Sequence, residues 1–397
     1  MGMESSLSLA NGQSLGSDVH VRNSLAPAIV SSCTMGTPDT VIKAIPDNAR
    51  FIEYYACMHD DLDLFFSHLS RPRSALRVFA ESAGGDDEEG EANAAAFSQA
   101  LRREFRGRDI IALASFIPEI MPPGALSPKA VAALKFLVMT AAKLKIADRS
   151  FVVEFVGGSR TRGLTKRVRR IKHGEGIWED DRYRVGVLSS SELRSSIQDL
   201  IKRLEPVAVE AEERGILLAL ELEPGPFFLI NSASALDLFC QELNSGSAQS
   251  WKNAIGLNLD VAHWAFLSKH PMPDSPKLDL SWLEKREYVL NRIVHAHISD
   301  QSIGHLGDLH LTAVHQDADF APWLELIARR AARKPDVDHG VLPFSGFISI
   351  EHEACKTPEQ IHYSFDILTK WVSQIACNSV QYPASAICDG RQSDVSP

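Results

Sequence analysis

The 397-residue sequence is poor in the features that mark several large classes of protein. It has no uninterrupted apolar run of the roughly 18 residues that a membrane-spanning helix needs. Even its most apolar helical segment, residues 130–147, contains Lys135, Lys143 and Lys145. Its 41 basic residues are outnumbered by 51 acidic ones, giving a formal net charge of −10. We therefore expect neither a membrane protein nor one whose whole surface binds a nucleic-acid backbone.

Paired cysteines, a secretion signal and nucleotide-binding loops are also lacking. The six cysteines contain no C-x-x-C pair, which favours reduced thiols in a cytosolic protein and disfavours a cysteine-based zinc site. Residues 1–23 carry Glu4 where a signal peptide would be basic, and no apolar stretch follows it. No glycine-rich phosphate-binding turn follows the first expected strand, which weakens a nucleotide-binding fold. These absences predict a cytoplasmic protein with a different kind of site.

What the sequence does contain is a repeated alternation of short apolar runs with helical segments. The strand candidates are residues 28–30, 51–54, 75–80, 110–114, 151–156, 216–222, 255–259, 293–298 and 347–350. Helix starts are marked by Ser127-Pro128, by the capping box from Ser189 to Glu192 and by Thr357-Pro358. Strands that alternate with helices predict a parallel sheet, and eight strands close it into a barrel. We expect either 75–80 or 110–114 to lie outside that barrel.

The fold prediction is an α/β protein with a single (β/α)8 TIM barrel between two disordered tails. Residues 1–23 and 383–397 are polar and serine-rich, so they offer little apolar surface to offset the entropy of ordering. Residues 24–382 are expected to form the barrel. Within it, the acidic run 86–91 is expected to be a solvated loop, and residues 301–319 an inserted loop.

Acidic residues and histidines gather at the ends of the last four strand candidates. Same-side pairs, two residues apart, are Glu221 with Glu223, His295 with His297, and Glu351 with Glu353; Asp260 and His263 follow the strand between the first two pairs. The carboxyl ends of parallel barrel strands form the active face, so one residue of each pair should point into its mouth. The sequence therefore predicts that these side chains converge.

A shared metal ion is the simplest explanation for such convergence. Buried carboxylates without partners would each cost several kcal/mol, and a cation shared among them removes that cost. Glu221, Asp260 and His297 are spaced by about one strand–helix unit, and Glu351 follows after the inserted loop. Three carboxylates and one imidazole are a mostly oxygen ligand set, which favours Mn²⁺ or Mg²⁺, with Co²⁺ or Zn²⁺ possible.

Four segments carry a resemblance to a known family. Residues 218–221, 256–263, 294–300 and 346–351 resemble the signature strands of the xylose isomerase-like TIM-barrel superfamily, which includes sugar isomerases, ketose 3-epimerases, dehydratases and endonuclease IV. The match covers roughly residues 189–376. The resemblance implies that Glu221, Asp260, His297 and Glu351 bind the metal and that His263 contacts substrate. It also implies that Glu221 and Glu351 act as acid and base through an enediolate.

The departures from the family pattern leave alternatives open. Endonuclease IV uses additional histidines on earlier strands for a three-metal cluster, and the runs 76–80 and 153–157 contain none. The ketose 3-epimerases follow the ligand histidine with Gly-Glu, whereas this chain has Ile298-Ser299. A metal-dependent isomerase or epimerase acting on a sugar or polyol derivative is the main prediction. A dehydratase or lyase on a related carbohydrate is the alternative, followed by an abasic-site nuclease and by a ligand-binding barrel without catalysis.

Further residues are candidates for substrate contacts. These are Glu223, Trp264, His295, Asp308 and His310, together with Arg160 from the basic run 160–173, which is equally compatible with a solvated excursion. Trp178 or Trp264 could stack on a sugar ring or belong to the core. The expected partner is a small carbohydrate, and the chain is also a candidate for a homo-oligomer.

Overall fold

The fold is described from a computed structural model of the chain. The structure describes residues 25–31, 44–57, 87–115, 128–156, 188–224, 228–245, 249–272, 275–305, 308–317, 319–352 and 357–378.

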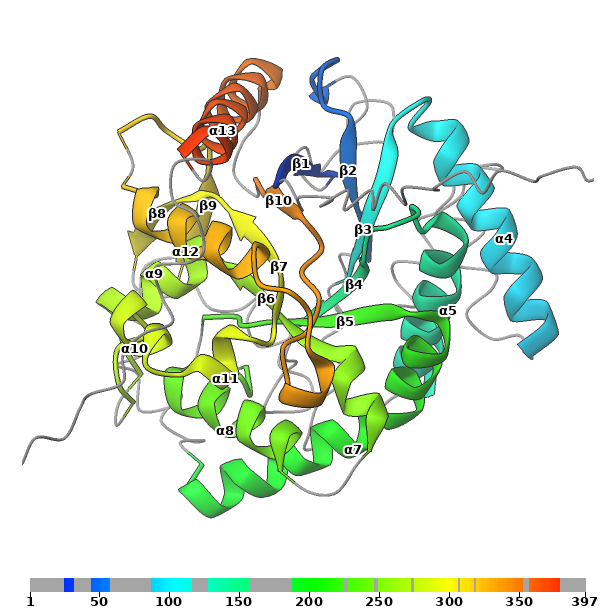
Figure 1. Ribbon diagram of the computed structural model, residues 1–397, viewed down its shortest axis with the longest axis vertical. Coiled ribbons are helices and arrows are strands. Elements are labelled where there is room, and N and C mark those ends of the chain that lie inside the picture. The colour runs from blue at the N-terminus through cyan, green and yellow to red at the C-terminus, as the bar shows by residue number, and fades with distance from the viewer. Residues whose placement is uncertain are drawn as a thin grey trace, which may run out of the picture.

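Eight parallel strands form a closed barrel (Figure 1). They are β1 (Ala26–Val30), β2 (Phe51–Cys57), β3 (Asp109–Ser115), β4 (Phe151–Val156), β5 (Ile216–Glu221), β6 (Ile255–Asp260), β7 (Ile293–Ile298) and β10 (Phe347–Ile350). The ring closes where β10 pairs with β1, placing Ile29 beside Ile350. The predicted (β/α)8 barrel is thus confirmed. Residues 110–114 belong to β3, and residues 75–80 lie outside the described part of the chain.

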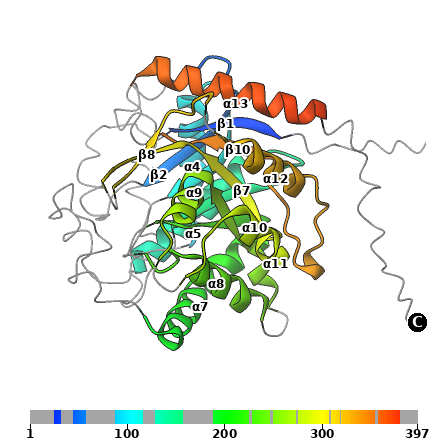
Figure 2. The ribbon, with the colours of Figure 1, turned by 90° about the vertical axis from the view of Figure 1, so that its left-hand side faces the viewer.

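The described helices lie around the outside of this barrel (Figures 1 and 2). They are α4 (Asp87–Glu104), α5 (Pro128–Leu144), α7 (Ser190–Arg214), α8 (Ala233–Asn244), α9 (Val261–Lys269), α10 (Leu280–Glu284), α11 (Glu287–Leu290), α12 (Ala321–Ala331) and α13 (Pro358–Asn378), with the 3-10 turns η3 (Ser250–Ala254) and η4 (Val337–His339). Helix α13 contacts both β1 and β10. The last helix therefore covers the seam where the first and last strands meet.

The helix-start signals in the sequence correspond to real helix ends. The Ser189 side chain accepts a hydrogen bond from the backbone N–H of Glu192, whose carboxylate accepts from the N–H of Ser189, so α7 has a complete capping box. Pro128 and Pro358 are the first residues of their helices. Helix α7 ends at Gly215, whose φ of 63° is left-handed and suits glycine. These three predicted helix starts are confirmed.

Two predicted loops have regular structure instead. The acidic run 86–91 was expected to be a loop, but α4 begins at Asp87. Negative charge in the first turn of a helix is favoured by the helix dipole, and Glu91 also pairs with Lys143 of α5 at 2.8 Å. The expected loop 301–319 contains an antiparallel hairpin of β8 (Asp300–His305) and β9 (Asp308–Thr312). The loop predictions, based on local charge and on segment length, were therefore wrong for both segments.

The core fills the barrel and the layer between the barrel and its helices. Every residue of β4, β5, β6 and β7 is buried, because one face of each strand points into the barrel and the other faces helices. Gly256 allows close approach of β6 to β7, since a Cβ there would lie 2.5 Å from the Val294 side chain. This packing fixes the positions of the strand ends.

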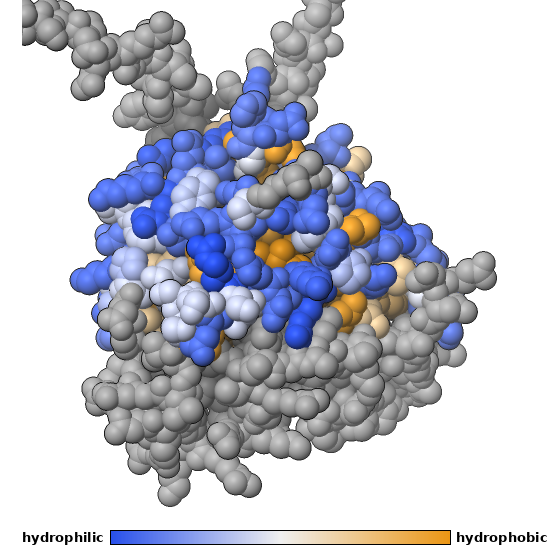
Figure 3. Space-filling view, turned by 90° about the horizontal axis from the view of Figure 1, so that it is seen from below, coloured by the Kyte–Doolittle hydropathy of each residue, from blue (hydrophilic) through white to orange (hydrophobic). Residues whose placement is uncertain are grey.

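The described surface is mostly polar. On the face in Figure 3, hydrophilic residues surround scattered apolar ones. Among the described residues the large hydrophobic side chains that stand exposed are Val337 and Tyr363. None of the described helices combines the length and apolar content that a bilayer crossing requires.

Candidate metal centre and active site

Four strand ends bring together the four residues that the sequence predicts as metal ligands. Glu221 ends β5, Asp260 ends β6, His297 is the penultimate residue of β7, and Glu351 directly follows β10. One ligand atom of each lies within 4.8 Å of the others, and all four side chains are buried. The strand ladders set this geometry, because Asp260 is the register partner of His297 and the Glu351 N–H donates to the carbonyl of Ile298.

The two carboxylate oxygens of Asp260 differ in their hydrogen bonding. Its Oδ1 accepts the backbone N–H of His263 at 2.7 Å and so caps α9. Its Oδ2 is buried and has no hydrogen-bond partner. A buried carboxylate oxygen without a partner is costly unless it binds a cation. This oxygen, with the mostly oxygen donor set around it, fits a divalent metal ion.

His297 lies between two pairs of carboxylates. Its Nδ1 is 3.1 Å from Oε2 of Glu351 and 3.4 Å from Oε1 of Glu221. Its Nε2 is 3.0 Å from Oε2 of Glu53 and 3.3 Å from Oε2 of Glu154. The first nitrogen therefore faces the predicted ligands, and the second faces carboxylates that the sequence analysis did not select.

Glu53 and Glu154 border the candidate site, and sequence reasoning missed them. Both lie inside strands, Glu53 in β2 and Glu154 in β4, and their side chains are almost fully buried. The signal was present, because each is a lone acid within an apolar strand, as in the Phe151–Val156 run. These acids were missed because candidate ligands were sought only at the ends of strands.

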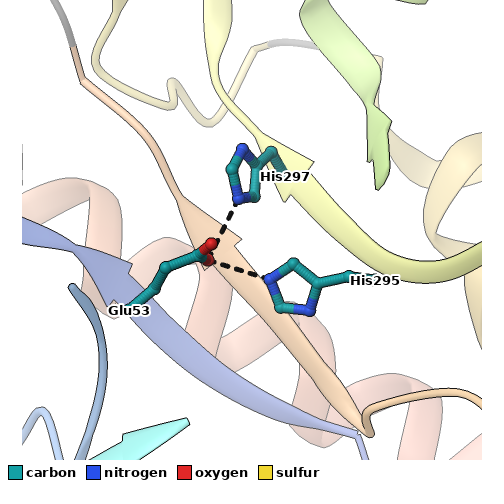
Figure 4. Close-up of side chains that lie close together, drawn as sticks. All are labelled: Glu53, His295 and His297. Carbon is teal, nitrogen blue, oxygen red and sulfur yellow. Dashed lines mark hydrogen bonds and ion pairs between the residues drawn. The ribbon is translucent and has the colours of Figure 1, made fainter. Parts of the chain in front are cut away.

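His295 lies deeper in the barrel than the sequence analysis expected for a substrate contact. It is completely buried, and its Nε2 is 2.8 Å from Oε2 of Glu53 and 3.2 Å from Oγ of Ser349. Its Nδ1 is 2.8 Å from Oγ of Ser345. Figure 4 shows His295 and His297 both directed at Glu53. All polar atoms of this imidazole are thus engaged by the protein itself.

His263 and Glu223 lie next to the ligand set. Because a carbonyl oxygen only accepts, Nδ1 of His263 donates a hydrogen bond to the carbonyl of Leu222 at 3.0 Å. Its Nε2 is 4.0 Å from Oε2 of Glu223, and its Nδ1 is 3.8 Å from Oε1 of Glu221. These two predicted substrate contacts are therefore adjacent to the candidate metal centre.

The remaining predicted contacts are placed elsewhere or not described. Trp264 is completely buried on α9, where it packs edge-on against Trp323 in the hydrophobic core. The backbones of Asp308 and His310 lie in β9. Arg160 and the rest of the basic run, Trp178 and Glu353 lie outside the described residues, as do the two predicted tails.

Sequence comparison decides the family. The model of the xylose isomerase-like TIM barrel matches residues 78–353, which is more than half of the chain. The chain belongs to this family. The resemblance seen in the four signature segments is thereby confirmed. No curated protein matches the sequence.

Solved structures share the fold of this xylose isomerase-like barrel at low sequence identity. A D-tagatose 3-epimerase-like protein is 14% identical with a TM-score of 0.51, over 89% of this chain and 99% of that one. A putative sugar phosphate isomerase/epimerase from Anabaena variabilis is 13% identical with a TM-score of 0.51, over 88% and 99%. A mannonate dehydratase from Streptococcus suis is 14% identical with a TM-score of 0.49, over 94% and 99%. The two structures with TM-scores of 0.51 support the fold alone, because their sequence identity to this chain is low.

The carboxylates of this xylose isomerase-like site differ in their affinity for protons. Burial opposes ionisation of Glu221, but hydrogen bonding and charge attraction from His297 outweigh it and lower its pKa from 4.5 to about 2. Burial raises the pKa of Glu351, and the charge of Glu221 adds to the increase. Burial, with the charge of Glu221, also raises the pKa of Glu154 well above the ordinary value. Neighbouring carboxylates are thus driven apart in pKa.

The two histidines of the site hold protons strongly when no cation is bound. Burial disfavours the charged imidazole of His297, but the charges of Glu53 and Glu154 outweigh it and raise its pKa well above 6.5. Burial acts the same way on His263, and Asp260 and Glu223 outweigh it to raise its pKa to about 10. A metal ion binds neutral imidazole, so cation binding to His297 must release a proton.

Proposed function

We propose that this protein is a divalent-metal-dependent isomerase or epimerase that acts on a sugar or polyol derivative. The observation that carries the proposal is the convergence of Glu221, Asp260, His297 and Glu351 within 4.8 Å at the ends of four barrel strands. Membership in the xylose isomerase-like family supports it. Mn²⁺ or Mg²⁺ suits three carboxylates and one imidazole best.

The metal would supply Lewis-acid stabilisation of negative charge on the substrate oxygens. Glu221 and Glu351 are the groups that move protons. One takes the proton from the carbon beside the substrate carbonyl, leaving its electron pair in an enediolate, and the other returns a proton to complete the isomerisation or epimerisation.

Proton exchange from deuterated water into a panel of ketoses and aldoses, followed by NMR, tests this function. We expect the wild-type protein with Mn²⁺ to exchange the proton beside the carbonyl of its substrate. Glu351→Gln should abolish exchange and leave the fold intact, because an amide cannot transfer that proton. Glu359→Gln is the matched control, since Glu359 lies exposed in the first turn of α13.

Exchange at the wild-type rate in Glu351→Gln would contradict the assignment. Exchange accompanied by loss of water from the substrate would instead assign the chain to the dehydratases, which begin with the same proton abstraction. Cytoplasmic location and assembly into a homo-oligomer remain predictions from the sequence.

A further inference from the structure

A connected set of hydrogen bonds crosses the barrel interior behind the ligand set. It joins β2 to β7 through Glu53, whose Oε2 lies 3.0 Å from Nε2 of His297 and 2.8 Å from Nε2 of His295 (Figure 4). It continues toward β10 through Ser345 and Ser349, which contact the two nitrogens of His295. Of these residues, His297 alone is one of the four expected ligands.

The directions of the contacts assign the two nitrogens of His297 to different tasks. Nδ1 faces Glu221 and Glu351, so it is the nitrogen on the side of the candidate cation. Nε2 faces Glu53 and carries the proton whenever Nδ1 binds a metal, because a neutral imidazole has one N–H. That N–H then donates a hydrogen bond to Oε2 of Glu53, which lies 3.0 Å from Nε2.

We propose that Glu53 is a positioning residue, which accepts the Nε2–H of His297 and thereby presents Nδ1 to the cation. A carboxylate that accepts the second N–H of a ligating histidine fixes its tautomer and ring orientation. The inference rests on the proposed function only in that it requires a cation at the ligand set.

Glu53 is held for this task by His295. The Ser345 hydroxyl donates to Nδ1 of His295, whose Nε2–H donates to the same Oε2 of Glu53 that accepts from His297. This assignment gives the Ser345 hydroxyl and the Nε2–H groups of His295 and His297 an acceptor each. Glu154, the competing acceptor, is farther from Nε2 of His297, at 3.3 Å. Glu53 is therefore the better placed of the two carboxylates.

Mn²⁺ titration calorimetry on the full chain, first treated with a chelator, tests the inference. Glu53→Ala should weaken Mn²⁺ binding about 10- to 100-fold, the range for such outer partners of a metal ligand. Glu53→Gln should lie between Ala and wild type, because the amide oxygen still accepts from Nε2–H. The matched control is Glu242→Gln, which also alters a largely buried, hydrogen-bonded carboxylate, on α8 outside the barrel. Binding by Glu53→Ala within about twofold of the wild type would overturn the inference.

Folding and function are separated by additional measurements. Circular dichroism of each variant without Mn²⁺ reports its fold. If Glu53→Ala does not fold, the Mn²⁺ dissociation constants of Glu53→Gln and Glu242→Gln are compared instead. A ratio of these two constants near one contradicts the inference. Mn²⁺ binding that depends on Glu53, with no proton exchange into any sugar, would refute the proposed function and leave the inference standing.

A wild type that binds no Mn²⁺ would refute both the proposed metal centre and the role of Glu53 in presenting Nδ1.

Discussion

Substitution of Asp260 should affect both the cap of α9 and the binding of a cation, and measurements with and without Mn²⁺ distinguish the two effects. Its Oδ1 caps α9, and its unpartnered Oδ2 lies among the candidate ligands. Asn is as good a helix cap as Asp but carries no charge to bind a cation. Asp260→Asn should therefore keep the cap of α9 in the presence of a chelator, losing there only the charge attraction to His263, and should gain much less stability than the wild type from Mn²⁺.

The magnitude follows from mass action. An ion present at 100 times its dissociation constant stabilises the folded protein by about 2.7 kcal/mol. If Asp260→Asn weakens binding about 100-fold, the same ion concentration stabilises the variant by only about 0.4 kcal/mol. The difference of about 2.3 kcal/mol corresponds to roughly 3 °C in Tm for a chain of this size, because its entropy of unfolding is about 0.8 kcal/mol/K.

Thermal unfolding in EDTA and in Mn²⁺ measures both effects. Asp260→Ala serves as the comparison, because it loses the cap as well and should be about 1 kcal/mol less stable than Asp260→Asn in EDTA. An Asp260→Asn variant that gains as much Tm from Mn²⁺ as the wild type would refute the ligand role. If the Tm of Asp260→Asn in EDTA is as low as that of Asp260→Ala, Asn does not replace Asp260 as the cap of α9.

Two further predictions concern pH and helix capping. The pKa of His263 is raised from 6.5 to about 10, so its contribution to stability is fully present below pH 6.5 and is lost as the pH rises through 10. In EDTA the difference in free energy of unfolding between wild type and His263→Gln should therefore shrink from pH 6.5 to 10 in urea titrations, and a difference that grows would be contrary evidence. Ser189→Ala removes the capping box of α7 and should lower the free energy of unfolding by about 1 kcal/mol with Mn²⁺ affinity unchanged; a loss of affinity would show that α7 is coupled to the site.

The sequence predicts the ligand set because a parallel barrel gathers the carboxyl ends of its strands. Once residues 216–222 and 255–259 are identified as strands, Glu221 and Asp260 must lie at the same rim. The hairpin at residues 300–312 was missed because a polar segment within a long connection gives little evidence of pairing. The strands themselves were recognisable from their apolar, β-branched content alone.

The network around Glu53 could not be predicted from the same reasoning. Glu53 and His297 are 244 residues apart in sequence, and their contact depends on how far the strands are staggered around the barrel. The alternation of side chains in β7 shows that His295 and His297 share a face, but it does not show that His295 would meet Ser345 and Ser349. Such pairings require the three-dimensional register.

The candidate ligands belong to the strands or directly follow them, so their positions do not depend on the connecting loops. Ladder hydrogen bonds set the heights of Glu221, Asp260 and His297, with Asn258 opposite Glu221 and Asp260 opposite His297. Connections between strands and helices can therefore be lengthened or exchanged without moving the candidate ligands. For protein engineering, the barrel is a fixed frame on which loops from relatives could be grafted to alter which molecule enters the candidate site.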